Sequence, residues 1–91
     1  MMSYEYIDHV LANYFATSIG HTEQEAIDAL RRDLAASPEL AAGLRRDAQG
    51  VLADASYSWK KSLEDYDVLT VEDEDEARRY GRSLLAAVLG L

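Results

Sequence analysis

The sequence predicts a small all-α domain built from four main helices, with a short helix or loop around residues 57–70. Apolar residues recur three and four positions apart along most of the chain, which is the spacing that lines one face of an α-helix. The only alternating stretch, Tyr57–Trp59, has no second strand candidate with which to pair. A chain of 91 residues is expected to form one helical domain over residues 1–91.

The first helix is predicted to run from about Ser3 to Thr17. Gly20 suits its C-terminal cap, because glycine reaches the left-handed conformation without steric cost. The apolar face of this helix would consist of Tyr4, Ile7, Val10, Leu11, Tyr14 and Phe15.

Two capping patterns predict the next two helices. Thr22 and Glu25 have capping-box spacing, in which side chains and backbone N–H groups satisfy one another. Ser37 and Pro38 predict a third helix, with serine as the N-cap and proline in the first turn. The buried face of the second helix would hold Ala26, Ile27, Leu30 and Leu34. The third would bury Leu40, Leu44, Ala48, Val51, Leu52 and Ala55.

Residues 56–71 are predicted to form a short helix and then a loop, with Ser62 and Asp65 as a candidate cap. Thr70 and Asp73 form a further capping pattern that would open the last helix. The apolar face of this last helix would contain Ala77, Tyr80, Gly81, Leu84, Leu85, Val88 and Leu89.

Composition predicts a cytoplasmic protein with no membrane partner. The chain has no cysteine, which favours a reducing compartment and excludes disulfides and thiolate metal sites. Glu5 and Asp8 stand where a signal peptide would carry bases and then an apolar run. The longest apolar stretch, from Leu84 to Leu91, is far too short to span a bilayer.

Negative charge is concentrated in one short segment. Eight of the thirteen residues from Glu64 to Glu76 are acidic, and no base interrupts them. Residues 1–61 sum to −3, residues 62–76 to −8 and residues 77–91 to +3, which gives the net charge of −8. Such a field attracts a basic partner and repels nucleic acid and anionic membranes.

Local helix chemistry explains only part of this segment. The first turn of the last helix would favour acids because of the helix dipole. Glu74 and Asp75 precede Arg78 and Arg79 by four residues, the favourable orientation for helix ion pairs. This explanation does not reach the upstream acids, so we predict that the segment binds a partner. The predicted contact residues are the acids Glu64, Asp65, Asp67, Glu72, Asp73 and Glu74, with Tyr57, Trp59 and Tyr66 as aromatic anchors.

Trp59 and Leu63 are equally compatible with core packing, because buried aromatic and aliphatic residues follow the same helical spacing. Val68 and Leu69 add further apolar residues among the acids. The sequence leaves core and interface open for Trp59 and Leu63.

No metal, cofactor or enzymatic activity is expected. A calcium loop starting at Asp65 would have Leu69 at a ligand position and Thr70 where the loop needs glycine. His9 and His21 do not have metal-ligand spacing. The arginine pairs at 31–32, 45–46 and 78–79 have acids close by in sequence, so helix-surface ion pairs are expected rather than nucleic-acid binding.

The chain resembles the small helical immunity proteins of bacterial contact-dependent growth inhibition systems. The resemblance is carried by short segments along the chain: Tyr14-Phe15, Glu25-Ala26-Ile27, Pro38-Glu39-Leu40, and Arg79-Tyr80 ahead of Leu84-Leu85. The segment from Tyr57 to Asp75 departs from the family pattern. The resemblance implies a cytoplasmic protein that binds and neutralises the toxic domain of a cognate effector.

The preferred hypothesis is therefore an immunity protein that covers the basic cleft of a toxin, with a nuclease as the expected toxin class. Two alternatives remain open. One is an acidic nucleic-acid mimic that inhibits a DNA-binding protein, and the other is a homodimeric helical adaptor. The sequence leaves the oligomeric state undetermined.

Overall fold

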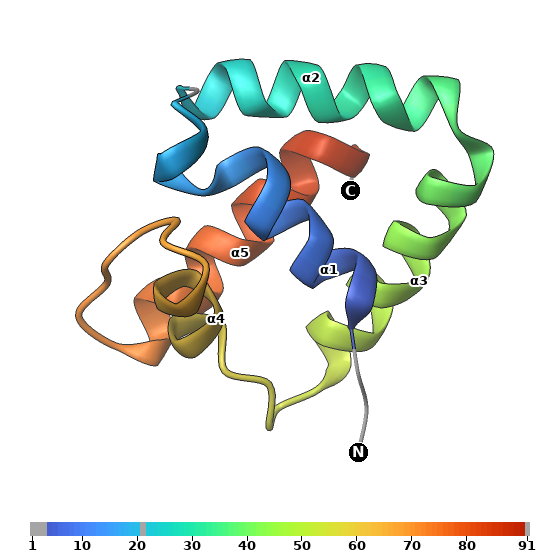
Figure 1. Cartoon of the computed structure of the whole chain (residues 1–91). Coiled ribbons are helices and arrows are strands. Elements are labelled where there is room, and N and C mark those ends of the chain that lie inside the picture. Colours follow the sequence, from blue (N-terminus) through green and yellow to red (C-terminus); the bar gives the residue numbers. More distant parts are fainter. Residues whose placement is uncertain (1–3, 21, 91) are drawn as a thin grey trace.

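The computed structural model describes residues 4–20 and 22–90 and confirms the all-α class (Figure 1). Within these residues every regular element is helical. The elements are α1 (Glu5–Val10), a π-helical segment (Leu11–Phe15), a 3-10 turn (Thr17–Ile19), α2 (Glu23–Ala36), α3 (Pro38–Ala53), α4 (Trp59–Asp65) and α5 (Glu74–Leu89). The predicted first-helix start at Ser3, and His21, lie outside the described residues.

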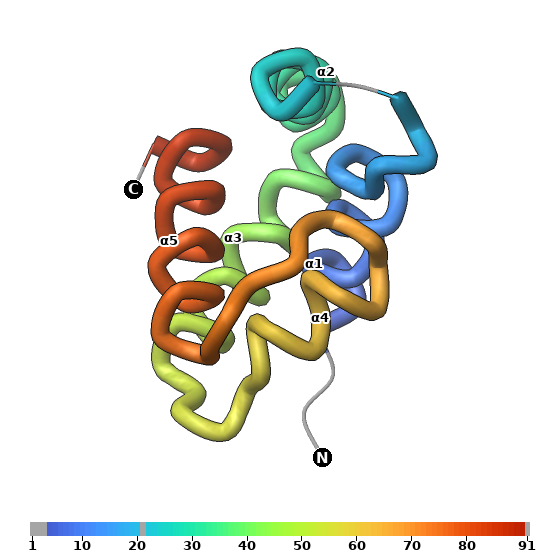
Figure 2. Tube along the Cα trace, turned by 90° about the vertical axis from the view of Figure 1, so that its left-hand side faces the viewer, coloured from blue at the N-terminus to red at the C-terminus, as the bar shows by residue number. Residues whose placement is uncertain are grey.

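The helices pack as a small bundle in which α2 lies across the others. α1 packs on α3 and α4 packs on α5, while α2 contacts α3, α5 and the π-helical segment. Figure 2 shows α2 almost end-on, whereas α5 runs along the side of the molecule. The Cα radius of gyration is 12.2 Å, and a compact chain of this length is expected to have about 12 Å.

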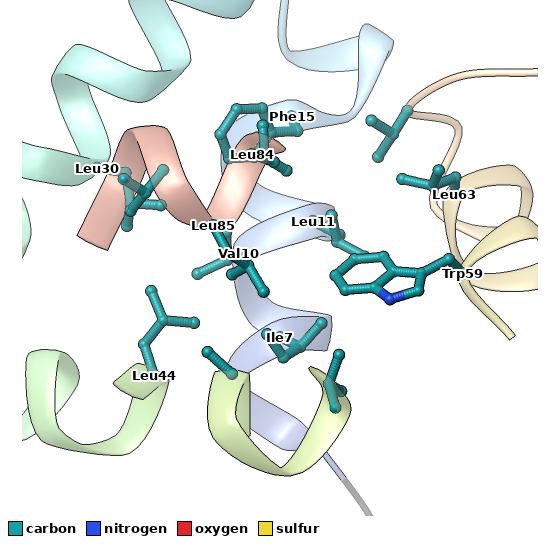
Figure 3. Packing of buried hydrophobic residues seen from close by; sticks show 14 of the residues in the cluster. Ile7, Val10, Leu11, Phe15, Leu30, Leu44, Trp59, Leu63, Leu84 and Leu85 are labelled. Atoms are coloured by element: carbon teal, nitrogen blue, oxygen red, sulfur yellow. The ribbon is translucent and has the colours of Figure 1, made fainter. Parts of the chain in front are cut away.

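The core draws side chains from all five α-helices (Figure 3). Leu30, Leu44 and Leu63 are completely buried, from α2, α3 and α4 respectively. Trp59 of α4 is only 3% exposed and points toward Leu11 in Figure 3. Trp59 and Leu63 are therefore core residues, which closes the alternative that the sequence left open.

The predicted starts of α2 and α3 form with the capping hydrogen bonds that the sequence indicates. The Thr22 hydroxyl accepts a hydrogen bond from the Glu25 N–H at 3.1 Å, and the Glu25 carboxylate accepts one from the Thr22 N–H at 2.9 Å. The Ser37 hydroxyl caps α3 by accepting from the Leu40 N–H at 3.2 Å. Each cap satisfies N–H groups that a helix start leaves without a partner.

The end of the first helix differs from the prediction. The π-helical segment stops at Phe15, because Ala16 turns to an extended conformation with ψ of 135°. Gly20 does adopt the left-handed conformation, with φ of +85°. It terminates the 3-10 turn, however, and its N–H donates to the Thr17 carbonyl at 3.1 Å.

Two predicted caps are wrong. α4 begins earlier than expected, because the Ser58 hydroxyl accepts from the Lys61 N–H at 3.1 Å. Ser62 lies inside α4, and its hydroxyl accepts from the Tyr57 hydroxyl at 2.8 Å.

The cap of α5 is Asp73 rather than Thr70. The Asp73 carboxylate accepts from the Glu76 N–H at 2.8 Å, so the helix begins at Glu74. Val71 is 5% exposed and is part of the core. The Asp73 cap places the start of α5 downstream of the predicted start at Thr70.

α1 is capped from a distant part of the chain. The Tyr4 side chain, at the N-cap position, forms no capping hydrogen bond to α1 in the described part of the chain. Instead the buried Asp47 carboxylate of α3 accepts from the Tyr6 N–H at 2.8 Å. The Tyr4 hydroxyl also donates to Asp54 at 2.8 Å. These two contacts fix the start of α1 against α3.

Candidate interaction surface

The predicted contact acids lie on α4, on the connection to α5 and in the first turn of α5. We call residues 66–73 the acidic loop. The Thr17 N–H donates to the Asp67 carbonyl at 2.8 Å, and the Thr17 hydroxyl donates to the Asp67 carboxylate at 2.6 Å. Asp67 has φ of +56°, a conformation that Asp tolerates better than most residues. These contacts hold the acidic loop against the 3-10 turn.

Two valines anchor the acidic loop to the core. Val68 and Val71 are 8% and 5% exposed. Between and beyond them, Leu69, Thr70 and Glu72 are exposed. The loop therefore presents outward-facing side chains from a backbone held at several points, which lowers the ordering cost of binding a partner.

Leu69 is the exposed apolar residue of this surface, with 39% of its area accessible. The predicted contact set did not include it. The signal that could have identified it is the pattern of the loop itself, in which two valines three positions apart enclose Leu69 and Thr70. Once both valines are buried, the residues between them face solvent.

Two of the predicted contact acids form ion pairs within the chain. Glu64 pairs with Lys60, and Asp65 pairs with Lys61 at 2.7 Å. These are the only ion pairs among the described residues. Both are solvent-exposed helix pairs, of a kind that contributes about 0.3–0.5 kcal/mol.

The predicted ion pairs within α5 are absent. The Glu74 carboxylate instead accepts from the Ser58 hydroxyl at 2.7 Å and from the Lys60 N–H at 3.2 Å. The guanidinium of Arg78 donates to the Ala55 carbonyl at 2.8 Å. Glu74 is therefore engaged in joining α5 to the start of α4, and we remove it from the proposed contact set.

These contacts determine the ionisation of Glu74. Partial burial would raise its pKa, but the hydrogen bonds from Ser58 and from the Lys60 and Trp59 N–H groups, with the charge of Arg78, hold the pKa below its usual value of 4.5. A carboxyl whose pKa is lowered on folding stabilises the fold above its unfolded-state pKa. That stability is lost as the pH falls below about 4.5 toward the folded-state pKa.

We therefore expect Glu74→Gln to lower the free energy of unfolding by about 1 kcal/mol at pH 7. The difference in the free energy of unfolding between this variant and the wild-type protein should become smaller as the pH falls below the usual carboxyl pKa of 4.5. Urea denaturation at a series of pH values measures it. Asp75→Asn is the matched control, because it removes the same charge from the same turn. If the free energy of unfolding had the same pH dependence in both variants, the Glu74 carboxylate would not stabilise the fold through its contacts with the start of α4.

The predicted aromatic anchors do not stand together on the surface. Trp59 is buried, so the prediction that it is an exposed anchor is corrected. Tyr57 packs edge-on against Tyr4 and Trp59, each with ring centroids 5.3 Å apart. Burial raises the pKa of Tyr57 to about 12. Tyr66 is half-buried, and burial together with the nearby Asp8 carboxylate raises its pKa. Tyr57 and Tyr66 therefore pack toward α1.

A hollow of about 270 Å³ lies beside the acidic loop. Carboxylates at its edge and an apolar floor would suit the aliphatic stem and charged end of a lysine or arginine. Its lining residues are Thr17, Leu63, Glu64, Asp67, Val68, Leu69 and Thr70.

The described residues contain neither a candidate metal-binding cluster nor a candidate membrane-spanning helix. No three histidine or acidic side chains converge there as a metal ion would require. None of the described helices combines the length and apolar content of a membrane-spanning segment.

Comparison with protein-family models, curated proteins and solved structures finds no match to this chain. The resemblance to immunity proteins accordingly stays a proposal that rests on the sequence.

Proposed function

We propose that this chain is an immunity protein that binds and neutralises a basic toxin domain through the acidic loop and the adjoining end of α4. The observation that carries the proposal is the acidic loop itself. Its exposed acids, Asp67, Glu72 and Asp73, form no ion pair among the described residues, while the buried valines hold the backbone that presents them.

Electrostatics and packing supply different parts of this function. Complementary charge accelerates the encounter of two proteins, whereas close apolar contact slows their dissociation. Leu69 and the hollow beside it provide the apolar contact that the buried Trp59 does not. A nuclease domain has the right chemistry as partner, because its active cleft is basic in order to hold a phosphate backbone.

Neutralising the acidic loop tests the proposal. The triple variant Asp67→Asn, Glu72→Gln and Asp73→Asn removes three charges and keeps oxygen acceptors for Thr17 and for the α5 cap. The matched control, Glu5→Gln with Asp28→Asn and Glu39→Gln, removes three exposed charges elsewhere. The partner to be used is the cognate toxic domain, which the proposal expects to be encoded in an effector gene beside that of this chain.

The acidic-loop triple is expected to bind this domain at least about tenfold more weakly, with a smaller salt dependence. Wild-type and control proteins should bind equally and restore growth when the domain is co-expressed. Titration calorimetry at several salt concentrations measures binding. Equal affinity and equal salt dependence for both triples would refute the acidic-loop mechanism, and a lack of growth protection by the wild-type chain would refute immunity.

A further inference from the structure

A second hollow lies where the C-terminal end of α5 meets α2 and α3. Its volume is about 290 Å³. The floor is aliphatic, and Arg31 of α2 and Arg45 of α3 flank it. The lining residues are Arg31, Leu34, Ala35, Ala41, Arg45, Val88, Leu89 and Gly90.

The two arginines of this hollow are available to a partner. Both are exposed, and neither forms an ion pair with any residue that the structure describes. The acids near them in sequence are Asp28, Asp33 and Asp47, and each accepts a hydrogen bond from another group. Asp28 accepts from the Gln24 side-chain amide at 3.0 Å, Asp33 from the Tyr14 hydroxyl and the buried Asp47 from the Tyr6 N–H. Two guanidinium groups beside an aliphatic floor suit a segment that carries carboxylates next to an aliphatic side chain.

The acidic loop of this same chain has that chemistry. Leu69 is exposed between Asp67 and Glu72, and neither acid forms an ion pair in the described part of the chain. The loop adjoins the start of α5 (Figures 1 and 2), whereas Val88, Leu89 and Gly90 place the hollow at its end. The 16 residues of α5 separate them by about 24 Å, so a chain cannot fill its own hollow.

We propose that a second copy of this chain docks its acidic loop into the hollow. Leu69 contacts the aliphatic floor, and Asp67 and Glu72 face Arg31 and Arg45. The contact is heterologous, because it joins two different surfaces and leaves one loop and one hollow unoccupied in each pair. It does not rest on the proposed function. Where both hold, self-association and toxin binding compete for the acidic loop.

The net charge of −8 opposes self-association, and salt weakens this repulsion. At physiological ionic strength charges are screened beyond about 8 Å, while the shortest dimension of the molecule is 21 Å. Repulsion between whole molecules is therefore largely screened. Arginine–carboxylate pairs in direct contact retain their attraction.

Two variants and their mixture test this contact. The hollow variant is Arg31→Glu with Arg45→Glu, and the loop variant is Leu69→Ser with Glu72→Lys. Sedimentation equilibrium measures the mass. The wild-type protein should rise above its monomer mass of 10.1 kDa as concentration increases to the millimolar range. Each variant alone should associate at least about tenfold more weakly.

Mixing the two variants should restore a one-to-one pair, because the mixture contains one intact hollow and one intact loop. The matched control is Arg32→Glu with Arg46→Glu, which makes the same charge change at the neighbouring exposed arginines. This control should associate as the wild-type protein does. Circular dichroism confirms that each variant is folded.

A wild-type protein that stays monomeric at millimolar concentration overturns the proposal. So does a mixture that stays monomeric, or a control that loses association together with the hollow variant. If Arg31 and Arg45 serve only to stabilise the end of α5, the hollow variant will lose stability while the wild-type protein remains a monomer. The toxin is absent from every step, so failure here leaves the proposed function untouched.

Discussion

Replacing Trp59 with alanine is expected to lower the free energy of unfolding by about 3–5 kcal/mol. Trp59 is 3% exposed and is the largest side chain that α4 contributes to the core. Its removal leaves a cavity between α4 and α5 that the surrounding helices cannot close completely. A chain of this length has a total stability of about 5–14 kcal/mol, so the loss is a large fraction of the total.

Urea denaturation followed by far-ultraviolet circular dichroism measures this loss, because the substitution removes the only tryptophan. Leu69→Ala is the matched control, since it also shortens an apolar side chain but at an exposed position. The control should change stability by less than about 0.5 kcal/mol. A loss below about 1 kcal/mol for Trp59→Ala would contradict its place in the core.

The second large effect is expected from Gly81→Ala in α5. A Cβ atom at Gly81 would lie 2.5 Å from Cδ2 of the Trp59 ring, which is closer than real contacts allow. Overpacking should lower the free energy of unfolding by about 1–3 kcal/mol. The loss appears even though alanine is favoured over glycine within a helix by about 1 kcal/mol.

Two comparisons give this prediction its test. A Cβ at Gly43 would lie 2.3 Å from Cζ of Tyr6, but Tyr6 is only half-buried and its ring end can swing into solvent. Gly43→Ala should therefore cost less than Gly81→Ala.

The second comparison introduces Gly81→Ala into the Trp59→Ala variant. There the substitution should no longer lower the free energy of unfolding, because the ring that would clash with the new Cβ is absent. Urea denaturation of all four proteins in this double-mutant cycle gives the coupling energy, expected at about 1–3 kcal/mol. Additive effects would contradict direct contact between the two sites.

The helices could be predicted because their signals are local. The Thr22 capping box and the Ser37-Pro38 start involve residues within three positions of one another, and both form as predicted. The spacing of apolar residues likewise assigned most of the core correctly. The same local rules misplaced the caps of α4 and α5, because Ser58 and Asp73 also have capping side chains and these form the hydrogen bonds.

The ion pairs and anchors of the candidate site depended on contacts between distant segments. Glu74 was expected to pair with Arg78 one turn along its own helix. It meets Ser58 and the Lys60 N–H instead, because α4 packs against the start of α5. Trp59 was a candidate anchor because it lies close to the acidic residues in the sequence. Proximity in sequence does not show which face of α4 packs against the core.

The sequence by itself determined that the chain is helical, and it determined where the charge is concentrated, because helix spacing, capping and charge are properties of neighbouring residues. Only the tertiary structure decided that Trp59 is buried, that Leu69 is exposed and that Asp47 caps α1 from another helix. The physical reason is that burial and long-range hydrogen bonds depend on how the helices pack together. The spacing of apolar residues indicates which face of a helix is apolar. Which individual side chains are covered depends on the neighbouring helices.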